Sequence, residues 1–168
     1  HIPPIDSADY YALSILALIL ADGDSSRLYR RLVYENNWIT GLFAGPNEYL
    51  GPQLFRIWFQ IQADVAPETI IEALDREVAD IRDCGVTERE LEKARNQVTY
   101  RFVGRMSTVS RIGDLLAHSA SIYGDPDRVN SQMDRYLKVG KKEIREAADR
   151  YLISSNRTLI CVRPGRKV

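Results

Sequence analysis

Histidine and cysteine are scarce in this chain. Its 168 residues include two histidines, His1 and His118, and two cysteines, Cys84 and Cys161. Zinc sites are built mainly from Cys and His at short, characteristic spacings, and none of these four residues shows such a spacing. His118 also lacks a Glu or a second His at helical spacing, so we expect it on a helix surface or in a hydrogen bond. For the cysteines we predict free thiols of open role, and a disulfide between them is not excluded.

A charge excess and a long apolar run are missing as well. Lys plus Arg number 23 and so do Asp plus Glu, which gives a formal net charge of zero. Proteins that bind nucleic acids or anionic membranes usually carry a basic excess. The most apolar segment, Ala12–Ala21, is about half as long as the roughly 20 residues of a bilayer-spanning helix. The sequence therefore predicts no nucleic-acid partner and no membrane span, and it indicates a soluble protein in which Ala12–Ala21 is a buried helix.

The chain has the length of one ordinary domain. Residues 1–168 contain no internal repeat, no low-complexity segment and no linker long enough to divide them, so we expect a single domain. The sequence opens on His1-Ile2-Pro3-Pro4, without an initiator Met or the regions of a signal peptide. We therefore expect a piece of a longer protein. Its compartment, whether bacterial cytoplasm or periplasm, stays open.

Hydrophobic periodicity predicts mainly helices. The predicted helices run from Asp6 or Ser7 to Gly23, from Ser25 or Ser26 to Asn36, from Pro67 to Gly85, from Thr87 through Phe102, and over Thr108–Tyr123, Pro126–Leu137 and Lys141–Ile153. The predicted strands are Trp38–Ala44 and Gln53–Gln62, as an antiparallel pair, and Thr158–Arg163. Thr87 and Glu90 have the spacing of a capping box. Because residues 1–4 read as the tail of a further strand, the order predicts an α+β fold in which helices cover an antiparallel or mixed sheet whose first strand is missing.

Three arginines and two tryptophans stand out within these elements. Arg27, Arg30 and Arg31 lie on one predicted helix. A phosphate or acidic-substrate site is one interpretation, and a solvated helix face with ion pairs to nearby Glu35 or Asp24 is the favoured one. Trp38 and Trp58 fall in the predicted strands, where we expect them to anchor the core or a partner interface.

Several segments together resemble one known family. They are Pro3-Pro4-Ile5-Asp6, Ser25-Ser26-Arg27-Leu28-Tyr29-Arg30-Arg31-Leu32, Val86-Thr87-Glu88-Arg89-Glu90-Leu91-Glu92-Lys93-Ala94-Arg95-Asn96-Gln97, Tyr123-Gly124-Asp125-Pro126 and Ile144-Arg145-Glu146-Ala147-Ala148-Asp149-Arg150-Tyr151-Leu152. In this order and spacing they are similar to the C-terminal-type domain of the pitrilysin/insulinase metallopeptidases, which include mitochondrial processing peptidase. The similarity extends over nearly the whole chain and implies the fold of that domain.

The resemblance implies that zinc chemistry belongs to another domain. The family's zinc site uses an inverted H-x-x-E-H motif, whose Glu activates the bound water. No such motif occurs in this chain. We therefore expect no cofactor here, a zinc ion in the partner domain of the parent protein, and no peptidase activity from this chain alone.

The resemblance also implies two positions that face the active site. In many members the C-terminal-type domain supplies an Arg and, seven residues later, a Tyr that position the substrate and stabilise the oxyanion. These places fall on Val33 and Thr40, and neither side chain can do the same work. A shifted register would recruit Arg31 and Tyr34 instead.

Two hypotheses about function follow, and they differ in class. In the first, the chain is the non-catalytic domain of a zinc metalloendopeptidase. It walls the substrate chamber and supports a zinc-bearing domain of the same chain or of a partner subunit, with peptides or unfolded polypeptides as substrates. In the second, the chain is a proteolytically inactive assembly domain like the related core subunits of respiratory complexes. An intact H-x-x-E-H in the preceding domain or in a neighbouring subunit would favour the first. A third hypothesis, an unrelated small α+β enzyme with its own active site, is supported by no group of residues in the sequence.

Overall fold

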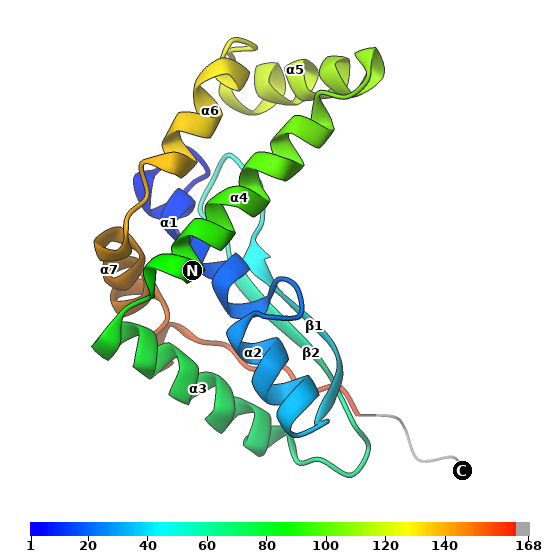
Figure 1. The fold of residues 1–168 in the computed structure, drawn as a ribbon, viewed down its shortest axis with the longest axis vertical. Helices are drawn as coiled ribbons and strands as arrows, with labels where there is room; N and C mark the ends of the chain where they lie inside the picture. Colours follow the sequence, from blue (N-terminus) through cyan, green and yellow to red (C-terminus); the bar gives the residue numbers. More distant parts are fainter. Residues whose placement is uncertain (164–168) are drawn as a thin grey trace.

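The fold consists of a β-hairpin and a set of helices arranged around one central helix (Figure 1). The computed structural model describes residues 1–163. The elements are α1 (Ala8–Ala21), α2 (Arg27–Tyr29), the π-helical segment η1 (Arg30–Glu35), β1 (Ile39–Pro46), β2 (Phe55–Ile61), α3 (Pro67–Cys84), α4 (Glu88–Arg105), α5 (Val109–Tyr123), α6 (Arg128–Leu137), α7 (Lys141–Tyr151) and the 3-10 turn η2 (Ser154–Asn156). This arrangement confirms the predicted α+β class.

The central helix is α1, and it is buried on every side. The Ser7 hydroxyl caps it by accepting a hydrogen bond of 3.1 Å from the backbone N–H of Tyr10. Its side chains pack against β1, α2, α4, α6 and α7. A helix that is apolar all round is stable in water only when other elements cover its whole circumference. The predicted buried helix is confirmed, and it determines where the other elements lie.

The two strands form the predicted antiparallel hairpin. Leu42 lies opposite Phe59 and Phe43 opposite Trp58 in the register. Side chains alternate along β2, so that Phe55, Ile57, Phe59 and Ile61 pack against the core while Arg56, Trp58 and Gln60 are exposed. A strand with one buried face has this period of two.

The predicted strand Thr158–Arg163 is wrong. These residues are exposed and have no regular secondary structure, and the sheet of the described residues has two strands. The apolar residues Leu159, Ile160 and Val162 favour an extended chain. A strand also needs a neighbour to exchange backbone hydrogen bonds, and none of the described residues supplies one here. Residues 164–168 lie outside the described part of the chain.

The remaining helices begin and end close to their predicted bounds. Pro67 occupies the first turn of α3, and Gly85 ends that helix with a φ of 77° that favours glycine. Ser26 occupies the N-cap position of α2, but its hydroxyl makes no capping hydrogen bond. The π-helical geometry of Arg30–Glu35 has no signal in the sequence that we recognise.

A largely buried arginine joins three of these helices. The Arg27 side chain, 13% exposed, donates to Glu90 from Nε at 2.6 Å and to Asp80 from Nη1 at 2.5 Å. It also donates to the carbonyl of Gly85 at 3.3 Å. These contacts connect α2 with the end of α3 and the start of α4. The predicted solvated face is therefore wrong for Arg27, because the arginine lies between helices that are distant in the sequence.

The other two arginines behave differently from each other. Arg30 forms the predicted ion pair with Glu35, at 3.4 Å, and stays exposed. Arg31 instead pairs with Glu77 of α3 at 2.8 Å. The cluster is thus mainly a joint between α2, η1 and α3, and its charges already have acidic partners.

Glu90 has two functions in this joint. Besides binding Arg27, its carboxylate accepts from the Thr87 backbone N–H at 2.7 Å and from the Thr87 hydroxyl at 2.9 Å. The Thr87 hydroxyl in turn accepts from the Glu90 backbone, so the predicted capping box is confirmed. Burial alone would raise the pKa of the Glu90 carboxyl, but the hydrogen bonds from Arg27 and Thr87 outweigh it and lower the pKa to about 2.

We expect truncation of the central helix to be severe. Ile15 is fully buried in α1, and Ile15→Ala should lower the free energy of unfolding by about 2–5 kcal/mol, because it removes buried methylenes and leaves a cavity. Urea denaturation checks this. Val103→Ala, at a position 61% exposed on α4, is the control and should stay within about 0.5 kcal/mol of the parent. Equal effects of the two substitutions would contradict the central position of α1.

We expect the Glu90 carboxylate to contribute stability that acid removes. Its folded pKa lies below the unfolded value, so its contribution is complete above about pH 4.5 and is lost as the pH falls toward 2. Glu90→Gln should therefore lower stability at pH 7 and flatten the decline of stability below pH 4.5. Thermal unfolding across this pH range is the measurement. Glu92→Gln, which changes an exposed carboxylate on the same helix, should leave the profile unchanged.

Candidate functional site

The outer face of the hairpin carries exposed aromatic side chains. We call Thr40, Phe43, Arg56, Trp58 and Gln60 the outer sheet face. Phe43 is 48% exposed and Trp58 is 55% exposed, although the two lie opposite each other and form one aromatic patch. Large exposed aromatic side chains in one patch often mark an interaction site.

A glycine gives Trp58 its position. A Cβ atom on Gly41 would lie 3.0 Å from Cζ3 and 3.3 Å from Cη2 of the Trp58 ring. A side chain at position 41 would therefore crowd the indole ring, which lies against β1. The sequence pattern predicted that Trp58 lies in a strand, but it was not assigned to a face of the sheet. The alternation of Arg56, Trp58 and Gln60 with Phe55, Ile57 and Phe59 is the signal that identifies this outer face.

The loop between the strands extends the apolar surface. Tyr49 and Leu50 are 60% and 63% exposed, and Leu54 is 46% exposed. Glu48 connects this loop to α5, because its carboxylate lies 3.2 Å from His118 Nε2. His118 was expected on a helix surface or in a hydrogen bond, and the first alternative is confirmed, because it lies partly exposed on α5.

The two positions that the family resemblance singled out lie in different surroundings. Val33 is half-buried in η1 and packs against the core. Thr40 is exposed on β1, where its hydroxyl donates to the Gln60 carbonyl at 3.4 Å. Thr40 thus belongs to the outer sheet face and Val33 does not. Their assignment to the family's Arg and Tyr positions stays a prediction.

The alternative alignment, in which Arg31 and Tyr34 take the family's Arg and Tyr positions, is disfavoured by the contacts of Arg31. Its guanidinium binds Glu77, whose side chain is only 10% exposed. Tyr34 is 63% exposed and packs edge-on against Tyr29, with ring centroids 5.5 Å apart. Moving Arg31 toward a substrate would leave the buried Glu77 carboxylate without this partner, which costs free energy.

Tyrosines of α1, α5 and α6 pack together, and those whose pKa is raised are not suited to acid–base chemistry near neutral pH. Tyr11 packs edge-on against Tyr10 and Tyr136, at centroid distances of 5.5 and 4.9 Å. Burial, followed by neighbouring tyrosines and Glu48, raises the pKa of the Tyr123 and Tyr136 hydroxyls, and burial raises that of Tyr10. The phenols of Tyr10, Tyr123 and Tyr136 therefore remain protonated near neutral pH, and they lie between α1, α5 and α6.

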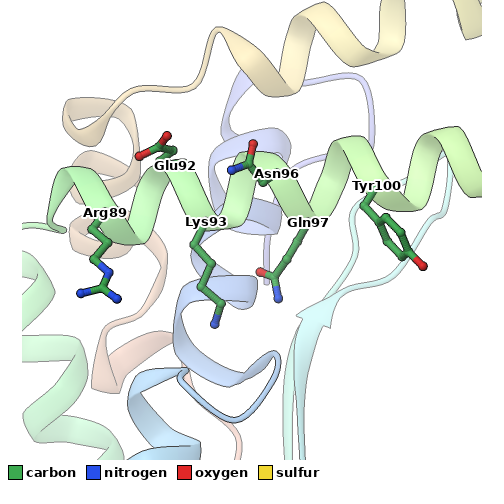
Figure 2. A pocket seen from close by; sticks show the side chains of 6 residues that line it. All are labelled: Arg89, Glu92, Lys93, Asn96, Gln97 and Tyr100. Atoms are coloured by element: carbon green, nitrogen blue, oxygen red, sulfur yellow. The ribbon is translucent and has the colours of Figure 1, made fainter.

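A shallow groove runs along α4, but its side chains have a structural function. Figure 2 shows the lining residues Arg89, Glu92, Lys93, Asn96, Gln97 and Tyr100, all from this one helix. Lys93 Nζ donates to the Asp22 carbonyl at 3.4 Å, and Gln97 Nε2 donates to the Asp22 carboxylate at 3.1 Å. Arg101 pairs with the same carboxylate at 2.6 Å. The groove thus belongs to the contact that holds the end of α1 against α4.

Metal-ligating side chains do not gather anywhere in residues 1–163. Within that range no group of three or more His, Cys, Asp and Glu is placed to hold a metal ion. Cys84 and Cys161 are free, as predicted, and both are exposed. No helix among the described residues is both long and apolar enough to cross a membrane.

Comparison with known proteins assigns this architecture to a family. The model of the Peptidase M16 inactive domain matches residues 1–98. The inactive peptidase domain of a protein assigned as a zinc protease in Bordetella parapertussis is 28% identical, with a TM-score of 0.83 over 94% of this chain and 85% of that chain. A second such protein, from Bordetella pertussis Tohama I, is 27% identical, with a TM-score of 0.81 over 94% and 87% of the two chains.

A third solved structure shares the fold at lower identity. A protease from Helicobacter pylori has a TM-score of 0.84 at 17% identity, and the similarity covers 92% of this chain but 37% of that one. No curated protein matches the sequence. Because the family model spans more than half of the residues, the chain belongs to the Peptidase M16 inactive domain family, as its resemblance to the pitrilysin/insulinase group predicted.

Proposed function

We propose that this chain is the non-catalytic domain of a zinc metalloendopeptidase, in which it walls the substrate chamber opposite a separate zinc-bearing domain. The observation that carries the proposal is the outer sheet face, on which Phe43 and Trp58 stay about half exposed in a protein of an inactive-domain family. Aromatic side chains on a flat sheet suit an extended, unfolded peptide, because they offer contact area without selecting one sequence.

The zinc-bearing partner follows from the same reasoning. Peptide hydrolysis by this chemistry needs a metal ion that activates water, together with a general base. The described residues gather no such ligand set. The domain boundaries that fit this role are residues 1–168, as one unit whose partner is another domain of the same chain or another subunit.

One observation favours a second function, that of a proteolytically inactive assembly domain. If Val33 and Thr40 occupy the family's substrate-positioning places, neither supplies a cation or a phenol to a reacting peptide. A parent protein that only assembles with partners has no need of those groups. An active parent would have to obtain them from another chain.

Zinc content and peptidase activity distinguish the two functions. We expect the parent protein to bind zinc and to cleave fluorogenic peptides, whereas the 168-residue chain alone should do neither. Metal analysis and fluorescence assays on both proteins are the measurements. A parent without zinc and activity would favour the assembly function, and stoichiometric zinc on the chain alone would contradict both.

Trp58 provides a more local test. In the active parent, Trp58→Ala should lower kcat/KM for peptides roughly tenfold, since losing an aromatic anchor that the bound peptide covers typically costs more than 1 kcal/mol. Tyr100→Ala is the matched control, because it removes an aromatic side chain that is 81% exposed on α4, in a different part of the fold. Thermal unfolding checks that both variants fold. Equal kcat/KM values for the two variants would contradict the proposal that the outer sheet face contacts the substrate.

A further inference from the structure

The loop between the two strands, residues 47–54, is attached firmly at one end and lightly at the other. Near β2, the Gln53 backbone exchanges two hydrogen bonds with Ile2, of 2.8 and 3.1 Å, and the Gln53 side chain donates to the Pro3 carbonyl at 3.3 Å. Near β1, Glu48 reaches His118 of α5. In the part of the chain that the structure describes, no other hydrogen bond or ion pair joins residues 47–52 to a helix. The position of this half of the loop therefore depends on the Glu48–His118 contact.

The strength of that contact depends on the charge of the imidazole. Glu48 Oε2 lies 3.2 Å from His118 Nε2, and both side chains are partly exposed. Histidine ordinarily changes its charge between about pH 5 and pH 8, whereas exposed carboxylates are ionised throughout this range. An imidazolium binds a carboxylate through its charge as well as through a hydrogen bond. A neutral imidazole keeps at most the hydrogen bond, and with its proton on Nδ1 it turns a lone pair toward the carboxylate. The contact therefore weakens as the pH rises.

The phenols that lie near Glu48 do not change their charge in this range. They belong to Tyr10 of α1, Tyr123 of α5 and Tyr136 of α6. Burial is the main cause that raises the pKa of each hydroxyl, and the charge of Glu48 contributes to the increase. These three side chains therefore stay neutral while the imidazole titrates.

The charged groups of the neighbouring helices are constant as well. They are Arg111 and Asp114 on α5, and Arg128 and Arg135 on α6. The Arg128 guanidinium lies over the Tyr123 ring, 4.8 Å from its centroid. Guanidinium groups and exposed carboxylates keep their charge between about pH 5 and pH 8. Of the groups around this contact, His118 is therefore the one that responds to pH.

The segment that the contact holds carries two exposed apolar side chains. Tyr49 and Leu50 follow Glu48 directly and are 60% and 63% exposed, so packing adds little to their attachment. A Cβ atom built on Gly51 would meet no other atom within 4 Å, which shows that the chain has free space around this glycine. Without the Glu48–His118 contact, residues 48–51 can thus move while Gln53 keeps its bonds to Ile2.

We propose that Glu48 and His118 form a pH-dependent clasp, which holds the loop between the strands against α5 when the imidazole is charged and releases it when the imidazole is neutral. Acid thereby fixes Tyr49 and Leu50 beside α5, and mildly alkaline solution frees them. The proposal does not depend on the proposed proteolytic function, because it concerns a contact within this chain alone.

Chymotryptic cleavage after Tyr49 and Leu50, followed by mass spectrometry, tests the clasp. The rate of such cleavage reports the population of the open loop when opening is fast. Near pH 5.5, the parent chain should be cleaved roughly two- to fivefold more slowly than the variant His118→Gln, as expected for a partly exposed ion pair. Near pH 8 the two rates should be equal. Comparing the two proteins at each pH removes the pH dependence of chymotrypsin itself, and cleavage after the exposed Leu159 is the internal reference.

Two further variants identify the partner of the imidazole. Glu48→Gln should abolish the difference near pH 5.5, because it removes the negative charge and keeps the shape of the side chain. Asp114→Asn is the matched control, since it removes an exposed carboxylate one turn before His118, and it should leave the difference intact. Equal rates for the parent chain and His118→Gln near pH 5.5 would overturn the proposal. A difference that survives Glu48→Gln, or that disappears in Asp114→Asn, would overturn it as well.

Discussion

The fold depends on the need to cover α1 on all sides. Ten of its 14 residues are buried, including Tyr10 and Tyr11 near its start and Ala21 at its end. Because no face of this helix suits water, the hairpin, α2, α4, α6 and α7 must all pack against it. The hairpin buries its inner side chains on α1, and this leaves Phe43 and Trp58 on the outer sheet face. The candidate site is thus a consequence of how the core is covered.

Hydrophobic burial does not by itself fix how α2, α3 and α4 meet, and the Arg27 joint supplies that specificity. A guanidinium that is 13% exposed needs partners at fixed positions, and Glu90, Asp80 and the Gly85 carbonyl provide them. Glu90 also caps α4. The Glu90 carboxylate therefore links the start of α4 to α2. This contact gives a structural reason for the segments around Arg27 and Glu90 that carry the family resemblance.

Local signals predicted most of the elements, because capping boxes, glycines and alternating side chains act within a few residues. Long-range partners were harder to predict. Arg27 appeared solvated because its acidic partners lie 53 and 63 residues away in the sequence. Thr158–Arg163 has the composition of a strand, but strand formation depends on a neighbour that composition does not reveal. For the candidate site, the alternation of apolar and polar residues along β2 was enough to predict that Trp58 faces outward. The family positions at Val33 and Thr40 came from resemblance alone.

The two free thiols are native attachment sites for a pair of distance probes. Cys84 ends α3 and Cys161 lies in the segment after η2, and both are exposed on a chain with no other cysteine. A pair of spin labels or fluorophores can therefore be attached without removing any native residue. The distance between the labels would report on the placement of the C-terminal segment relative to the helical body, with and without a partner domain. The scarcity of cysteine thus makes this chain directly accessible to distance spectroscopy.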